Sequence, residues 1–162
     1  MNIDENEIRN ILGNDAYLEP EILSAVLRFT LAFSYSEHKI MGEYAETRKC
    51  DDYAQSAASL TLQDVKAELF YFQNRYAIQA GHEQKLAELC NGDKHSEHQI
   101  LKALSGNEHE KLEVIESLFR ICLRLRHNLF HGRKWSYMLH NQIDNLNHAT
   151  DFLVKALRVT GN

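Results

Sequence analysis

Apolar side chains recur along this chain with the three- and four-residue spacing of α-helices. The first stripe begins after Pro20, continues to about residue 47 and comprises Ile22, Val26, Phe29, Phe33, Ile40 and Tyr44. It predicts one long helix, which a proline in the first turn suits because the N–H that proline lacks is unpaired there. A second stripe predicts another helix, with Thr61 as its N-cap and its end near Gly81. The chain between the two, residues 48–60, is predicted to be a loop with a short turn.

The second half of the chain predicts four more helical segments. Two short ones lie around residues 82–90 and 96–104. Asn107 and Glu110 are spaced as in a capping box and predict a helix from Glu108 to about Phe130, with Gly132 at the C′ position. The last helix is expected from about Ser136 to residue 158. Its inward-facing residues would be Leu139, Ile143, Leu146, Leu153 and Leu157.

These segments together predict an all-α protein. The expected architecture is an antiparallel helical bundle of four main helices plus short helices. Neither a long linker nor an internal repeat divides the sequence, so we expect a single domain over residues 1–162. Residues 1–18 would be either a flexible or a short helical N-terminal segment.

Composition narrows the functional classes. The apolar share of 44% and the charged share of 25% are those of a soluble globular protein, and no stretch approaches a membrane span of about 20 apolar residues. The three cysteines are far apart and form no Cys-x-x-Cys motif, which favours the reducing cytoplasm over a disulfide framework. We expect no membrane partner, no metal and no other cofactor.

Positive charge is concentrated in one segment of an acidic chain. The net charge is −5, yet residues 120–134 contain five Lys/Arg and no Asp/Glu. Without those five, 13 of the 18 Lys/Arg residues remain against 23 Asp/Glu. This pattern is typical of a local anion site rather than of a broad nucleic-acid surface.

An arginine followed by a histidine stands inside this basic segment. Spacing alone is weak support for a motif, because nine arginines and nine histidines should give roughly 0.5 matches per spacing by chance. Arg126 and His131 stand out from the other pairs because they lie at a predicted helix end and are accompanied by Asn128 and Gly132.

The sequence Arg-His-Asn-Leu-Phe-His-Gly-Arg-Lys-Trp, residues 126–135, resembles the signature of HEPN domains (higher eukaryotes and prokaryotes nucleotide-binding). The segment from Phe33 to Met41 resembles a first-helix pattern of one bacterial branch. His127 departs from the family, in which asparagine is commoner directly after the arginine. The resemblance implies a metal-independent endoribonuclease that acts as a homodimer on RNA, often as a toxin or antiviral effector. A separate antitoxin or regulatory chain would be a further partner.

The residue types suit RNA cleavage by the RNA's own 2′-hydroxyl. Our hypothesis is that His131 transfers the proton and that Arg126 stabilises the charge on the phosphate, which gives 2′,3′-cyclic phosphate and 5′-hydroxyl ends. Asn128 or His127 would orient the phosphate or the catalytic histidine. The remaining cations of the segment are candidates for contacts with RNA phosphates: Arg124, Arg133 and Lys134.

Helical geometry separates the two candidate catalytic residues. Positions 126 and 131 lie about 140° apart on a regular helix. Either the helix therefore breaks before His131, or a second copy of the chain completes the site in a C2 dimer. Glu37 interrupts the apolar stripe of the first helix, and we expect it to pair with Arg126 or another motif residue.

Two other interpretations stay open. The chain could be a non-catalytic HEPN-like module that binds a nucleotide or a partner, which the acidic remainder of the surface favours. Alternatively, it could be a purely structural helical dimer in which Arg126 and Glu37 form a buried ion pair.

Overall fold

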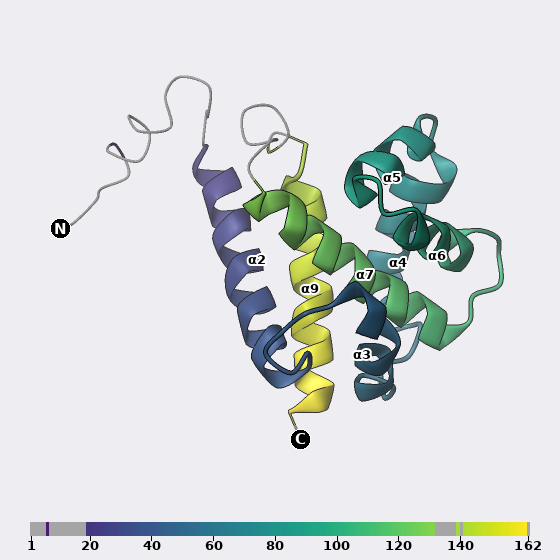
Figure 1. The fold of residues 1–162 in the computed structure, drawn as a ribbon, viewed down its shortest axis with the longest axis horizontal. Coiled ribbons are helices and arrows are strands. Elements are labelled where there is room, and N and C mark those ends of the chain that lie inside the picture. Colours follow the sequence, from purple (N-terminus) through teal and green to yellow (C-terminus); the bar gives the residue numbers. More distant parts are fainter. Residues whose placement is uncertain (1–5, 7–18, 132–138, 140, 162) are drawn as a thin grey trace.

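The computed structural model describes residues 6, 19–131, 139 and 141–161. Within these residues the chain is helical and contains no β-strand, so the predicted all-α class is confirmed for this part (Figure 1). The α-helices are α2 (Pro20–Lys39), α3 (Cys50–Ser56), α4 (Lys66–Gln73), α5 (His82–Cys90), α6 (Lys94–Leu104), α7 (Lys111–Phe130) and α9 (Ile143–Thr160). Two short turns of other helical types are η1 (Thr47–Lys49) and the π-helical η2 (Asn74–Ile78).

Three long helices form the frame of the molecule. α2 and α9, purple and yellow in Figure 1, pack side by side and run in the same direction. Arg28 in the middle of α2 accordingly lies 3.9 Å from Asp151 in the middle of α9. α7 runs antiparallel to both and packs against α9 on one side and against α3, α5 and α6 on others.

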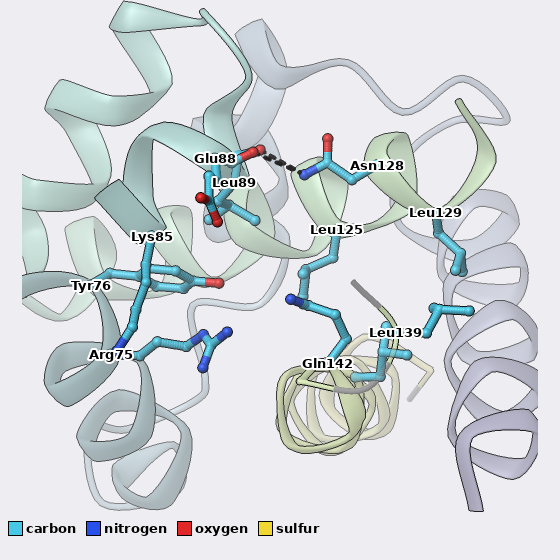
Figure 2. Close-up of a pocket in the computed structure, with 11 residues that line it drawn as sticks. Arg75, Tyr76, Lys85, Glu88, Leu89, Leu125, Asn128, Leu129, Leu139 and Gln142 are labelled. Carbon is cyan, nitrogen blue, oxygen red and sulfur yellow. Dashed lines mark hydrogen bonds between the residues drawn. The ribbon is translucent and has the colours of Figure 1, made fainter. Parts of the chain in front are cut away.

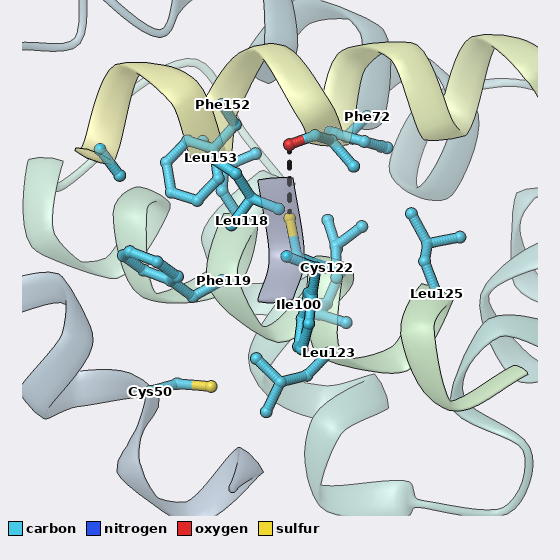
Figure 3. Close-up of a cluster of buried hydrophobic side chains, with 14 of the residues drawn as sticks. Cys50, Phe72, Ile100, Leu118, Phe119, Cys122, Leu123, Leu125, Phe152 and Leu153 are labelled. Carbon is cyan, nitrogen blue, oxygen red and sulfur yellow. Dashed lines mark hydrogen bonds between the residues drawn. The ribbon is translucent and has the colours of Figure 1, made fainter. Parts of the chain in front are cut away.

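The hydrophobic core is built around α7 (Figure 3). The ring of Phe119, which is fully buried, meets the ring of Phe152 edge-on at 4.8 Å and that of Tyr53 at 5.9 Å. The thiol of Cys122 lies 3.8 Å from the carbonyl oxygen of Ala149 in α9, to which it donates. Side chains from α3, α7 and α9 thus meet in one continuous core.

The first helix ends earlier than its apolar stripe predicts. α2 stops at Lys39 rather than near residue 47, because the chain turns through Gly42 (φ 67°) and Glu43 (φ 70°). A right-handed helix cannot continue through two residues of positive φ. Tyr44, which the stripe places on the buried face, is 77% exposed. The prediction was therefore wrong beyond Lys39.

Residues 48–60, predicted as a loop, contain helical structure. η1 leads directly into α3, which packs against α7. Cys50, Tyr53 and Ala54 of α3 are buried and have the i, i+3, i+4 spacing of a helix face. The loop prediction was wrong because a helix of seven residues shows too little periodicity in the sequence. Such a short helix depends on tertiary packing for its stability.

The second predicted helix is shorter at its start and changes type at its end. α4 begins at Lys66 rather than after Thr61, whose N–H and hydroxyl instead donate to Asp64 in a separate turn. From Asn74 the helix continues as the π-helical η2, and Gly81 follows at φ 78°. The predicted end near Gly81 is confirmed.

The remaining helices agree with the sequence except at their first residues. α5 and α6 lie where the two short helices were predicted, within two residues. α7 begins at Lys111, and Glu110 makes no side-chain cap hydrogen bond, so the predicted capping box is wrong. α9 begins at Ile143, whereas the sequence predicted its start near residue 136. Residues 136–138 of that predicted start lie outside the described residues, and so does Gly132, the predicted C′ residue of α7.

An ion pair between a buried carboxylate and a partly exposed lysine joins α4 to α9. The carboxylate of Glu68 is 1% exposed and lies 2.6 Å from the ammonium of Lys155. The second carboxylate oxygen of Glu68 is buried and has no hydrogen-bond partner in the described part of the chain. This carboxylate therefore depends on Lys155 for compensation of its charge.

Substitution Lys155→Met should lower the free energy of unfolding by about 3 kcal/mol, because it leaves the buried carboxylate uncompensated. Urea denaturation measures this change. The double variant Glu68→Gln/Lys155→Met should recover most of the loss, since it removes both charges. If Lys155→Met is as stable as the wild type, the ion pair contributes nothing to the free energy of unfolding.

Candidate functional site

From Arg124 to His131 the basic segment forms the C-terminal end of α7 and the residue that follows it, and its side chains point in three directions. Residues four apart share a side of a helix. Arg124 and Asn128 accordingly face α5, whereas Arg126 faces α2. His127 and His131 form a third side. Arg133 and Lys134, which were predicted to contact RNA phosphates, lie outside the described residues.

Arg124 and Asn128 hold the C-terminal end of α5. The amide of Asn128 donates to the Leu89 carbonyl at 2.9 Å, drawn as a dashed line in Figure 2. The guanidinium of Arg124 donates to the carbonyls of Leu89 and Cys90, and it lies 3.8 Å from Asp93. The last carbonyls of a helix lack partners within the helix and carry partial negative charge. Both side chains therefore satisfy the end of α5.

This arrangement corrects two sequence-based roles. Arg124, predicted to bind RNA phosphate, is only 8% exposed and directs its donors at protein carbonyls. Asn128, predicted to orient phosphate or His131, gives its amide hydrogens to α5 instead. The sequence could not show this, because the partners lie 34 to 40 residues away along the chain.

We expect Arg124→Met to lower the free energy of unfolding by about 2–3 kcal/mol, because buried carbonyls of α5 lose charged donors. Chemical denaturation would measure the loss. His131→Ala is the control from the same helix end: its side chain is exposed, so stability should change by less than about 0.5 kcal/mol. Equal stability of both variants would contradict the tethering role of Arg124.

Arg126 is half-buried between two aromatic rings. Its guanidinium carbon lies 5.9 Å from the ring centre of Phe33 in α2 and 5.5 Å from that of Phe130. Cation–π contacts of this kind hold a guanidinium in place without neutralising it. No ion pair or hydrogen bond of the Arg126 side chain is found among the described residues. Its charge therefore remains available to an anion.

Glu37 is not the partner of Arg126 within one chain. Its carboxylate accepts the N–H of Ala45 at 3.3 Å and thereby supports the turn that follows α2. The predicted pairing of Glu37 with Arg126 is therefore wrong for the single chain, and the structural alternative lacks the ion pair on which it was based. Glu37 interrupts the apolar stripe because its carboxylate accepts a backbone hydrogen bond from the turn after α2.

His127 and His131 lie against each other at the end of α7. Their ring centres are 4.3 Å apart with a tilt of 43°. Partial burial, assisted by the positive charges of Arg124, His131 and Arg126, lowers the pKa of His127. A histidine with a lowered pKa is neutral at pH 7 and can accept a proton. His131 is exposed and immediately follows the last residue of α7.

An open cleft of about 350 Å³ lies between the end of α7 and the chain that follows α2. Its lining residues are Phe33, Ala45, Glu46, Thr47, Arg48, Leu123, Arg124, Arg126 and His127. The cleft thus brings Arg126 and His127 together. His131 is not among the lining residues, and no contact joins it to Arg126 in the described part of the chain. In the structure His131, the C-cap residue of α7, thus lies outside the cleft that Arg126 lines.

Arg48 is a cleft residue that the sequence did not single out. Its side chain is 78% exposed and pairs with Glu46 at 2.6 Å. Lys49 also binds Glu46, and hydrogen bonds from Lys49 and Arg48 lower the pKa of that carboxyl. Glu46, the one carboxylate among the described lining residues, is therefore paired with two cations. No signal in the sequence marks Arg48, because only folding brings residues 45–48 to the end of α7.

The cysteines do not contribute a nucleophile. Burial raises the pKa of Cys50 and of Cys90 to about 12, and it also raises the pKa of the fully buried Cys122. Such thiols stay protonated and unreactive at neutral pH. In the described residues no three or more His, Cys, Asp or Glu side chains are grouped so as to hold a metal ion.

No protein-family model matches the chain, and comparisons with curated proteins and with solved structures give no significant match. None of the helices in the described residues is both long and apolar enough to cross a membrane.

Proposed function

We propose that this chain is a metal-independent endoribonuclease of the HEPN type that acts as a dimer. The observation that supports it most is the unpaired charge of Arg126 beside a histidine of lowered pKa in an open cleft. Both residues belong to the segment that resembles the HEPN signature. A toxin or antiviral role, with a separate antitoxin or regulatory chain, remains the biological setting that the resemblance implies.

The proposed chemistry requires a proton acceptor, a proton donor and a cation near one phosphate. Arg126 would hold the phosphate oxygens, because a guanidinium binds them through a planar fork and stays charged. Arg48 adds positive charge to the same cleft. His131 transfers the proton in this proposal, and His127 is positioned to share that role because its ring lies against that of His131.

RNA cleavage in EDTA should test the roles of the motif residues. We expect products with 2′,3′-cyclic phosphate ends, and losses of at least about 100-fold in Arg126→Ala and in His131→Ala. His98→Ala, an exposed histidine on α6, is the matched control and should cleave as the wild type does. Undiminished cleavage by His131→Ala would overturn the assignment of that residue.

An exposed apolar stripe on α2 supports the dimer. Leu27, Leu31 and Tyr35 follow one another at four-residue steps and are 59%, 62% and 55% exposed. Phe130, at the end of α7, is 55% exposed. Exposed apolar groups that share one side of a helix are typical of a contact surface. A second copy could bring its His131 to the cleft that Arg126 lines, which one chain does not achieve.

Sedimentation should show a dimer that Leu31→Glu converts to a monomer, because a charge then has to be buried at the interface. RNA cleavage should fall together with dimer content, while helical content by circular dichroism stays unchanged. Leu101→Glu on α6, at 36% exposure, is the control and should remain dimeric. A strictly monomeric protein that still cuts RNA would refute the shared site.

A non-catalytic nucleotide-binding module is the second candidate. The position of His131 outside the cleft of Arg126 favours it, since binding needs only the guanidinium. RNA binding that requires Arg126 and leaves the RNA intact would distinguish this function from cleavage.

A further inference from the structure

A small pocket lies on the other side of α7 from the cleft, between η2, α5 and the start of α9 (Figure 2). Its volume is about 60 Å³. Its apolar lining residues are Leu89, Leu125, Leu129, Leu139 and Leu146. The polar lining residues are Arg75, Tyr76, Lys85, Glu88, Asn128 and Gln142.

The guanidinium of Arg75 extends from η2 toward Leu125 and Gln142 across this pocket (Figure 2). Its Nε atom is buried and has no hydrogen-bond partner within the described residues. Its Nη2 atom makes a long hydrogen bond, 3.4 Å, to the carbonyl of Asn141, and its guanidinium carbon lies 5.7 Å from the ring centre of Tyr76. A buried donor of a charged group that lacks an acceptor is costly and rare. The pocket therefore presents a guanidinium of which one buried donor, Nε, lacks an acceptor among the described residues.

The backbone that carries Arg75 is itself unusual. η2 is a π-helical turn, and its last hydrogen bond runs from Gln79 N–H to the Asn74 carbonyl at 2.9 Å. Turns of this type are rare and occur frequently at functional sites, because the extra residue in the turn redirects side chains. Here the turn contributes both Arg75 and Tyr76 to the pocket. Burial raises the pKa of Tyr76, so its hydroxyl remains a neutral donor.

Lys85 and Glu88 are the other charged residues among the described residues that line the pocket. Lys85 is a second cation, and its ammonium lies 3.5 Å from the side-chain oxygen of Gln79. Glu88 is exposed on α5, where its carboxylate accepts a hydrogen bond from Gln84 at 3.0 Å. Among the described lining residues Arg75 and Lys85 thus supply two cations against the one carboxylate of Glu88.

We propose that this pocket binds a small carboxylate with a short apolar chain. A carboxylate matches the planar fork of a guanidinium and would satisfy the donors of Arg75. The alkyl chain would lie against Leu89, Leu125 and Leu146. Because about 10–15 Å³ of such volume holds one water, the pocket suits a molecule of about four to six heavy atoms. A phosphate is disfavoured, since its remaining oxygens would face the leucines without donors.

Titration of the full chain with butanoate, followed by 1H–15N NMR, tests the proposal. We expect saturable shifts of the Arg75 Nε–H signal and of the backbone amides of Tyr76, Leu125 and Gln142. Butan-1-ol has the alkyl chain of butanoate but no negative charge, and inorganic phosphate has negative charge but no alkyl chain. Both should bind at least about tenfold more weakly than butanoate.

Single substitutions test whether butanoate binds in this pocket. Arg75→Met should weaken butanoate binding at least about tenfold, because it removes the donors and keeps the length of the side chain. Gln142→Glu should weaken it also, since it puts a competing carboxylate opposite Arg75 and keeps the oxygen that accepts from Asn145. Arg158→Gln, exposed near the end of α9, is the matched control and should bind as the wild type does.

Three results would overturn the proposal. They are an absence of saturable shifts, binding of butan-1-ol or phosphate as tight as that of butanoate, and wild-type affinity in either pocket variant. Circular dichroism and thermal unfolding of each variant confirm that a lost signal reflects the pocket rather than the fold.

Discussion

The burial of α7 on nearly every side is the constraint on which the rest of the structure depends. The helix contacts α2, α3, α4, α5, α6 and α9, and its residues from Ser117 to Leu125 are buried without interruption. A helix buried all round has no polar face in which to place charges. Arg120 and Arg124 therefore lie inside the protein, and each needs acceptors there. Arg120 pairs with Glu116 at 2.7 Å, and Arg124 binds the end of α5.

This constraint divides one basic segment into groups with different roles. Cations in the buried turns bind acceptors inside the protein, whereas those in the last turn reach the surface. Arg126 and His127 line the cleft because α7 emerges from the core at that point. The functional proposal therefore depends on where burial ends along the helix rather than on how many basic residues the segment contains.

The last turns of α7 also separate two candidate binding sites. Arg126 and His127 face the cleft, while Leu125 and Leu129 face the small pocket. Both sites present arginine, but their walls differ. The cleft is open and includes exposed charges, as suits a polyanion; the pocket combines one guanidinium with leucines, as suits a small amphipathic acid.

The sequence by itself determined the all-α class, the positions of most helices and the motif at the end of α7, because apolar periodicity and glycine positions are local properties of the chain. It also separated Arg126 from His131, since that angle follows from helical geometry. Only the tertiary structure decided that Arg124 and Asn128 hold α5, that Glu37 bonds to Ala45, and that Arg48 joins the cleft. The physical reason is that a polar side chain takes the partner that packing brings to it, and packing joins residues far apart in the sequence.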